Sequence, residues 1–272
     1  MTRAELIKNS VNFTNESPNN YISAAAAISP EYVGMKIYES PIFAFGRPDD
    51  ELYIKYKSPD VIGSHSLTPH EWLLGAKTVI SFFLPYTQRI KKANAHDYQW
   101  PADEWLHGRY EGQIFLKNLA AYINQLLQDA GHESLIPADD PRFGLSGAGT
   151  MFTSRWSERH VAYACGLGTF GLSGGLITIK GMSGRLGSIL TTLDLPKDIR
   201  PYGGIYDYCT MCGVCISHCP AHAISIENGK AHAPCSDFLD SVREKNSPRF
   251  GCGKCQVNVP CESGMPYSHQ RK

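Results

Sequence analysis

Apolar and polar positions along the chain follow two different periods. Residues 103–131 repeat apolar side chains at the three- and four-residue spacing of an amphipathic helix, and Gly131 ends the pattern. The repeating positions are Ile114, Leu116, Leu119, Tyr122, Ile123, Leu126 and Leu127. A second helix is predicted at 156–165, just before a glycine-rich turn.

Strand-like apolar runs, bounded by Pro or Gly, make up much of the remainder. They lie at 36–45, 78–86, 175–181 and 185–195, and a short strand with a turn is expected at 132–140. Residues 223–234 predict a hairpin that turns at Asn228-Gly229. Residues 1–30 are expected to be an adaptable N-terminal segment. Helices and strands together predict an α+β fold.

Eight of the nine cysteines lie after residue 208. A disulfide framework would be spread through a small secreted domain, so this crowding favours metal or cluster ligation. The segment "YCTMCGVCISHCP" (208–220) has the spacing C-x2-C-x2-C-x3-C-P, which is that of bacterial ferredoxins. In such a run three thiolates bind one 4Fe–4S cluster, and the fourth binds a neighbouring cluster.

The remaining cysteines complete two clusters by count. We expect Cys209, Cys212, Cys215 and Cys261 to bind the first, and Cys219, Cys235, Cys252 and Cys255 to bind the second. Zinc is the alternative, but a zinc ribbon uses two cysteine pairs and not a run of four that ends in Cys-Pro. Cys165 stands apart and is interpreted as a small buried hydrophobe.

The segment "GLGTFG" (166–171) matches G-x-G-x-x-G, yet it does not predict a dinucleotide site. That motif follows a strand and opens a helix, whereas here a helical pattern precedes it and a strand pattern follows. The glycines are expected to allow a tight turn or a close approach of the backbone to a large flat ligand.

The charges balance, with 26 basic and 26 acidic residues, so no nucleic-acid partner is expected from net charge. The longest apolar runs are too short to span a bilayer, and no signal peptide is recognised, so we expect a cytoplasmic protein without membrane association.

From "WSERHVAYACGLGTFGLSGGLITIKGMSGRLGSILTTLDL" to the cysteine run, the chain resembles the cobalamin-dependent epoxyqueuosine reductases and reductive dehalogenases. The resemblance implies a nitroreductase-like core in residues 1–200 that binds base-off cobalamin. It also implies a ferredoxin-like domain with two 4Fe–4S clusters in residues 201–272. The clusters would pass electrons to cobalt, and the cofactor would supply the difficult chemistry.

The corrin contacts that this resemblance implies lie around the glycine-rich turn. They are Trp156, His160, Gly166, Gly168, Thr169, Phe170, Gly171, Leu176 and Ile177. His160 could equally be a helix-face residue, and a base-off cofactor needs no histidine below cobalt.

The two halves of the resembled family differ in their proton donor. Epoxyqueuosine reductases place an Asp about thirteen residues before the turn, and here that count reaches Phe152, so the expected acid is missing. Dehalogenases use a Tyr assisted by Lys or Arg. The candidates are Tyr110, with Tyr163 as the alternative donor, and Lys180 and Arg185.

The leading hypothesis is therefore a reductase of a small organic substrate such as an organohalide, which receives electrons from an external low-potential donor such as ferredoxin or flavodoxin. Three alternatives remain open. They are an activase that reduces the corrinoid of a partner, a flavin-type reductase, and a tRNA-modifying epoxyqueuosine reductase.

Overall fold

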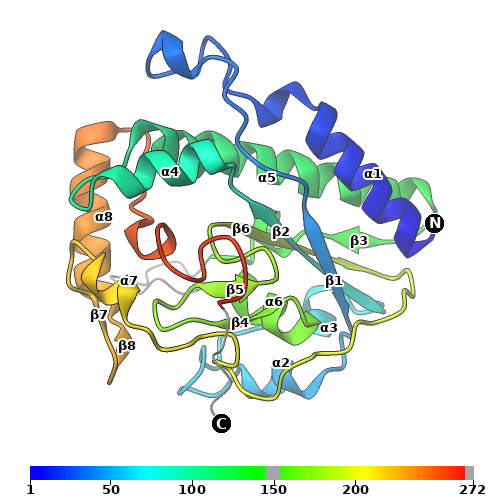
Figure 1. The fold of residues 1–272 in the computed structure, drawn as a ribbon. Coiled ribbons are helices and arrows are strands. Elements are labelled where there is room, and N and C mark those ends of the chain that lie inside the picture. The colour runs from blue at the N-terminus through cyan, green and yellow to red at the C-terminus, as the bar shows by residue number, and fades with distance from the viewer. Residues whose placement is uncertain (145–153, 267–272) are drawn as a thin grey trace.

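A four-stranded antiparallel sheet forms the centre of the computed structural model, which describes residues 1–144 and 154–266 (Figure 1). The strands lie in the order β1-β2-β6-β3. Their bounds are β1 (Ile42–Gly46), β2 (Thr78–Pro85), β6 (Gly184–Thr191) and β3 (Ser134–Leu135). Every residue of β2 is buried, which explains why its sequence is almost continuously apolar and does not alternate.

Helices cover both faces of this sheet. The long α5 (Asp103–Asp129) lies on one face with α1 (Arg3–Glu16) and α4 (Gln88–His96), as Figure 1 shows. The opposite face is covered by α6 (Glu158–Cys165). Successive side chains of β2 point to opposite faces, so Phe82 joins the first core and Phe83 the second.

The glycine-rich turn lies on the α6 side and leads into a small hairpin. Its strands are β4 (Gly168–Phe170) and β5 (Leu176–Thr178), and the short helices α2 (Glu51–Lys55) and α3 (Pro69–Trp72) lie nearby. Gly166 ends α6 with a positive φ of 95°, and a Cβ on Gly168 would overlap the carbonyl oxygen of Ile177. A helix precedes this motif and a strand follows it, as predicted, so the turn is not a Rossmann phosphate loop.

The cysteine-rich part packs against the core through backbone hydrogen bonds. It contains α7 (Val214–Ser217), β7 (Ile224–Ser225), β8 (Gly229–Lys230) and α8 (His232–Asn246). The N–H of Met182 donates to the carbonyl of Cys261 (2.9 Å), and the N–H of Phe170 donates to Ile205 (2.8 Å). The predicted boundary between residues 200 and 201 stays a prediction.

Two segments differ from the expectations drawn from the sequence. Residues 1–30 are not merely adaptable, because α1 begins with a capping box formed by Thr2 and Glu5. Its Phe13 stacks on Tyr122 of α5 at 4.4 Å between ring centroids. The hairpin predicted at 223–234 is present, but it ends before His232, where the unpredicted α8 begins.

The other predicted elements are found with shifted ends. The strand predicted at 36–45 is regular only from Ile42, and the strand at 185–195 ends at Thr191. Within the described residues, none of the helices is both long enough and apolar enough to cross a membrane.

Candidate functional site

The first thiol group, defined as Cys209, Cys212, Cys215 and Cys261, lines a single cavity. The chain winds around this cavity in left-handed backbone conformations, with φ of 51° at Met211 and 76° at Gly213. Neighbouring thiols and burial raise the pKa of Cys261 to about 12, and burial is the larger cause. Burial likewise raises the pKa of Cys215, to about 11, so these two thiols are neutral until iron binding removes their protons.

The second thiol group, defined as Cys219, Cys235, Cys252 and Cys255, lies beside the first. Cys255 interacts electrostatically with Cys235 and Cys219, and Cys252 with Cys255 and Cys235. The N–H of Ala223 donates to the Cys219 sulfur at 3.3 Å, which is the kind of bond that stabilises a cluster thiolate. Among the other thiols, Cys255 has the largest electrostatic effect on Cys215, so the two thiol groups adjoin.

This arrangement suits clusters better than single ions. All nine cysteines are free thiols, and Cys165 is buried in the core, as predicted. Zinc would need its ligand atoms converging within about 2.3 Å of one point. Among residues 1–144 and 154–266, no three His, Cys, Asp or Glu side chains gather closely enough to hold one metal ion. Thiols around a four-iron cluster lie farther apart than those around one ion.

A buried lysine links the second thiol group to the core. Lys254 is fully buried between Cys252 and Cys255, and its Nζ donates to the backbone carbonyl of Asn94 at 2.8 Å. Asn94 in turn donates to the carbonyl of Cys252 at 2.9 Å. Burial lowers the pKa of Lys254, and attraction to Cys252 opposes that effect. The second thiol group thus has a fixed cation within its binding loop.

Most of the predicted corrin contacts have their side chains in the core. Trp156 is buried, donates to Ser188 Oγ at 2.8 Å and stacks on Tyr53. Thr169 is buried too and accepts a hydrogen bond from the N–H of Tyr208. The buried side chains also include Leu176 and Ile177. Their role as corrin contacts stays a prediction.

Other predicted contacts lie at the first thiol group's cavity or beside aromatic side chains. Gly171 lines the cavity of the first thiol group, as does Ile177. His160 packs between Tyr56 and Phe170, and its Nδ1 lies 2.8 Å from Ser157 Oγ. Burial and Arg159 lower the pKa of His160 to about 4, so this imidazole is neutral at pH 7.

The three predicted catalytic residues are dispersed. Lys180 is exposed at the turn after β5, and Tyr110 lies on α5 beneath the guanidinium of Arg249. Arg185, on β6, donates to Gln113 Oε1, and its Nε is buried without a hydrogen-bond partner in the described part of the chain. Their catalytic roles stay predictions, and Phe152 lies outside the described residues.

Arg185 has a neighbour that the sequence analysis did not select. Glu158 begins α6, and its Oε2 is buried without a hydrogen-bond partner among the described residues. Burial raises the pKa of Glu158 to about 7, although Ser188 and Arg185 oppose the shift. A neutral carboxylic acid at this position can donate a proton. Its only signal in the sequence is its place in "WSERH", and nothing in that pattern reveals burial.

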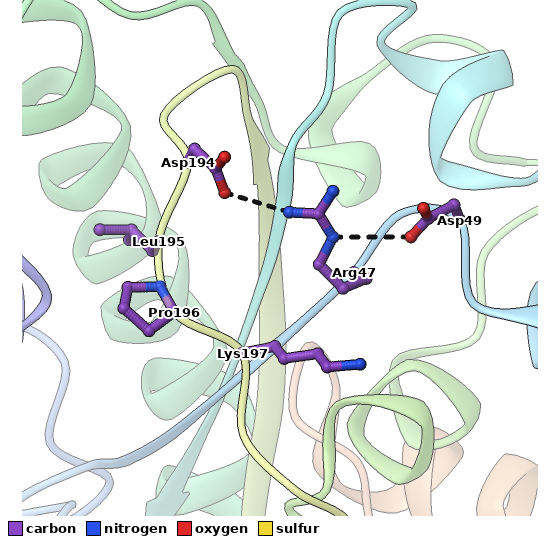
Figure 2. Close-up of a pocket in the computed structure, with 6 residues that line it drawn as sticks. All are labelled: Arg47, Asp49, Asp194, Leu195, Pro196 and Lys197. Atoms are coloured by element: carbon purple, nitrogen blue, oxygen red, sulfur yellow. Dashed lines mark hydrogen bonds and ion pairs between the residues drawn. The ribbon is translucent and has the colours of Figure 1, made fainter.

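A second cavity lies away from both thiol groups. Figure 2 shows Arg47 between Asp194 and Asp49, at 3.1 and 3.6 Å, with Lys197 beside them. Arg47 pairs with both acids there, and none of the residues that line the cavity is a cysteine. We therefore do not assign the chemistry to this cavity.

Comparison with known proteins gives matches at both sequence and fold level. The family model of the 4Fe-4S binding domain matches residues 204–225. The trichloroethene reductive dehalogenase of Dehalococcoides mccartyi is 30% identical over 104 residues, which cover 38% of this chain and 18% of that protein. The epoxyqueuosine reductase of Staphylococcus aureus is 29% identical over 161 residues, 55% of this chain and 37% of that protein. The matches thus span well under half of either relative.

Solved structures share the fold over almost the whole chain. Epoxyqueuosine reductase from Bacillus subtilis superposes with a TM-score of 0.55 at 19% identity, covering 98% of this chain and 66% of that one. A reductive dehalogenase described as B12-dependent gives a TM-score of 0.52 at 16% identity, covering 93% and 35%. The chain thus shares the fold of the epoxyqueuosine reductases and reductive dehalogenases, and it carries a 4Fe-4S binding segment near the C-terminus.

Proposed function

We propose that the chain is an iron–sulfur reductase in which two 4Fe–4S clusters deliver electrons to a base-off corrinoid that reduces a small organic substrate. The observation that carries this proposal is the pair of adjoining thiol groups beside a core of this fold. Each group supplies four thiols, the number that one 4Fe–4S cluster needs. Their contact at Cys215 and Cys255 gives electrons a short path between the clusters.

Unsatisfied polar atoms support a ligand site next to these clusters. Glu158 Oε2, Arg185 Nε and Ser183 Oγ are buried and have no hydrogen-bond partner among the described residues. Buried polar atoms are rarely left unpaired unless a ligand or water completes them. Such groups fit the amide-rich rim of a corrinoid. When bound, the corrinoid would supply a strongly reducing metal centre.

Glu158 is our candidate for the proton that completes the reduction. Replacing a substituent by hydrogen takes two electrons and one proton, and releases the substituent as an anion. The clusters carry one electron each, and the Glu158 carboxyl can supply the proton from Oε2. Arg185, on the adjacent strand, would stabilise the carboxylate that remains. Glu158 would thus serve as the acid, since the position at which epoxyqueuosine reductases have an Asp is Phe152 in this chain.

The first thiol group is the proposed entry point for electrons. Cys212 is exposed to solvent, and the adjacent Met211 is 38% exposed. An external low-potential protein such as a ferredoxin or flavodoxin could approach a cluster there. The second thiol group contains the buried Cys219 and interacts with Arg159 of the core. We therefore propose that electrons pass from the first cluster to the second and then to the core.

Metal analysis of anaerobically purified protein, before and after reconstitution with cobalamin, tests this proposal. We expect about eight irons per chain, as two 4Fe–4S clusters require, together with about one cobalt and the corresponding visible spectrum. About four irons would contradict the ligand assignment. Eight irons without cobalt, even after reconstitution, would contradict the corrinoid and favour an electron-transfer protein or activase. A flavin spectrum would favour the flavin-type alternative.

A further inference from the structure

Three arginines from three separate elements meet beside the proposed reaction centre. Arg109 comes from α5, Arg159 from the first turn of α6, and Arg185 from the start of β6. Arg185 donates a hydrogen bond to Gln113, one turn after Arg109 on α5, and Trp156 joins the start of α6 to β6 by donating to Ser188. Burial lowers the pKa of Arg109 to about 10, and repulsion by Arg185 and Arg159 adds to this shift. Arg185 likewise lowers the pKa of Arg159. The fold therefore holds together three like charges that disfavour one another.

Elsewhere in the chain, arginines with a carboxylate nearby form ion pairs. These pairs include Arg3–Asp198 (2.7 Å), Arg142–Asp140 (2.7 Å), Arg200–Asp50 (2.6 Å) and Arg249–Glu111 (2.5 Å), besides those of Arg47 and Arg243. In the described part of the chain, none of the three clustered arginines has an ion pair within 4 Å. The positive charge at this site is thus not neutralised by the described residues, although the chain as a whole is neutral.

The side chains next to the three arginines neutralise little of the positive charge of the guanidinium groups. Glu158 interacts with Arg185, but burial keeps this acid partly protonated at pH 7. Tyr38 and Tyr86 face Arg109, and burial raises the pKa of both, so they remain neutral. Arg109 stacks on one ring face of Phe250 at 4.6 Å, a ring that Arg243 also contacts, and its N–H groups make no hydrogen bond to the part of the chain that the structure describes.

A cluster in the second thiol group would balance only part of this charge. Arg159 interacts with Cys255 and Cys235, so iron and sulfide there would attract its guanidinium. Arg109 and Arg185 would still carry a surplus. Arg159 is exposed, whereas Arg109 and Arg185 are half-buried, so a ligand can reach the group from solvent. Planar guanidinium groups bind carboxylates through paired, charge-assisted hydrogen bonds.

We propose that Arg109, Arg159 and Arg185 form an anion site that binds the carboxylate of an organic acid substrate. This inference rests on the proposed function only in calling the bound acid a substrate. It narrows the substrate to organic acids, because a neutral molecule of the same shape would leave the surplus charge unmatched. Neutral solvents and gases would then be poor substrates.

Calorimetric titration of the anaerobically purified, cluster-loaded protein tests the site without turnover. The probes are benzoate, its neutral isostere benzamide, and inorganic phosphate. We expect benzoate to bind and benzamide not to bind. R109Q and R185Q should each weaken benzoate binding about tenfold or more, because each removes charge-assisted hydrogen bonds. R185K should retain part of the affinity because it keeps the charge.

R47Q is the matched control, since it removes one arginine charge at the cavity of Figure 2, away from the thiol groups. It should bind benzoate as the parent chain does, and iron content and circular dichroism should confirm that each variant is folded. Equal binding of benzoate by the parent, R109Q and R185Q would overturn the proposal, as would no binding. Binding of phosphate alone would overturn the carboxylate assignment.

Cobalt measured on the same samples separates the two proposals. Arginine-dependent benzoate binding by a chain that takes up no cobalt would contradict the proposed function and support the anion site. Cobalt uptake without arginine-dependent binding of benzoate would support the proposed function and contradict the anion site.

Discussion

The two thiol groups have the same number of cysteines but different surroundings. The first contains the exposed Cys212 and lines an apolar cavity. Burial, and then the neighbouring thiols, raise the pKa of Cys215 and of Cys261. The second contains the buried Cys219 and lies among cations. Lys254 interacts with Cys252, Lys230 with Cys255, and Arg159 with Cys235 and Cys255.

This difference predicts different reduction potentials, and different roles in electron transfer, for the two clusters. Nearby positive charge stabilises the extra electron of a reduced cluster and raises its potential. We therefore expect the second cluster to be reduced more readily than the first. The exposed first cluster would receive electrons, and the second would hold them next to the core. The four predictions below test this contrast.

Loss of one ligand should have the largest effect. C255S removes a second-group thiol where the two groups meet, so we expect iron to fall from about eight to about four per chain. Global stability should also fall, because this loop is anchored to the core through Lys254 and Asn94. C212S should lose the same amount of iron with less loss of stability, since Cys212 is exposed. Iron assays and thermal unfolding measure both, and equal stability losses would contradict the contrast.

Alanine substitution at two glycines, one in each thiol group's binding loop, compares how tightly the two loops are packed. Gly213 and Gly253 both lie within C-x2-C segments, with φ of 76° and 66°. A Cβ on Gly213 meets nothing closer than Ile216 at 3.8 Å, so G213A should cost only the left-handed strain, about 1 kcal/mol. A Cβ on Gly253 would overlap the ring of Trp105, so G253A should cost about 3 kcal/mol or more. Denaturant unfolding distinguishes these outcomes, and similar costs would show that Trp105 moves freely.

E158Q should change proton delivery and leave both clusters intact. Removing a positioned general acid costs about 10²-fold or more in rate. The acid form of Glu158 is present below its raised pKa of about 7, so the parent rate should fall as pH rises through 7. Arg185 and Ser188, both on β6, oppose the shift and would set its final value. E158Q should lose this dependence while its iron content stays unchanged. An unaltered pH profile would exclude Glu158 as the donor.

K254M should have the smallest effect and act on one cluster only. Methionine keeps the apolar stem of the buried side chain but removes the charge and its hydrogen bonds to Asn94. We expect about 1–3 kcal/mol of destabilisation, because the Asn94 acceptors lose a buried partner. The potential of the second cluster should fall while that of the first stays constant. Redox titration followed by electron paramagnetic resonance measures this, with Lys8→Met on the exposed face of α1 as the control.

The sequence predicted best what depends on local spacing. The amphipathic pattern predicted α5 closely because a 27-residue helix repeats its signal many times. The cysteine run indicated 4Fe–4S binding because a fixed spacing suits one cluster, and a family model matches the same segment. In contrast, α1 and α8 were missed, and their burial patterns are weak, with Val242 the one buried residue of α8.

Charge and protonation at the candidate site depended on burial. Glu158 stands in the segment that was selected for its resemblance, but its carboxyl becomes notable only because α6 packs it against β6. Arg109 lies within the helix pattern and was not among the residues predicted to be functional. Its significance comes from Arg159 and Arg185, which are 50 and 76 positions away in the sequence.

The sequence by itself therefore determined the secondary structure of the longest elements, the eight clustered cysteines and the likeness to a reductase family, because each depends on residues close together in the chain. Only the tertiary structure decided which thiols adjoin, which cations lie beside them and which charges have no partner. Those properties arise when distant segments are brought together and removed from water, and no local pattern records that event.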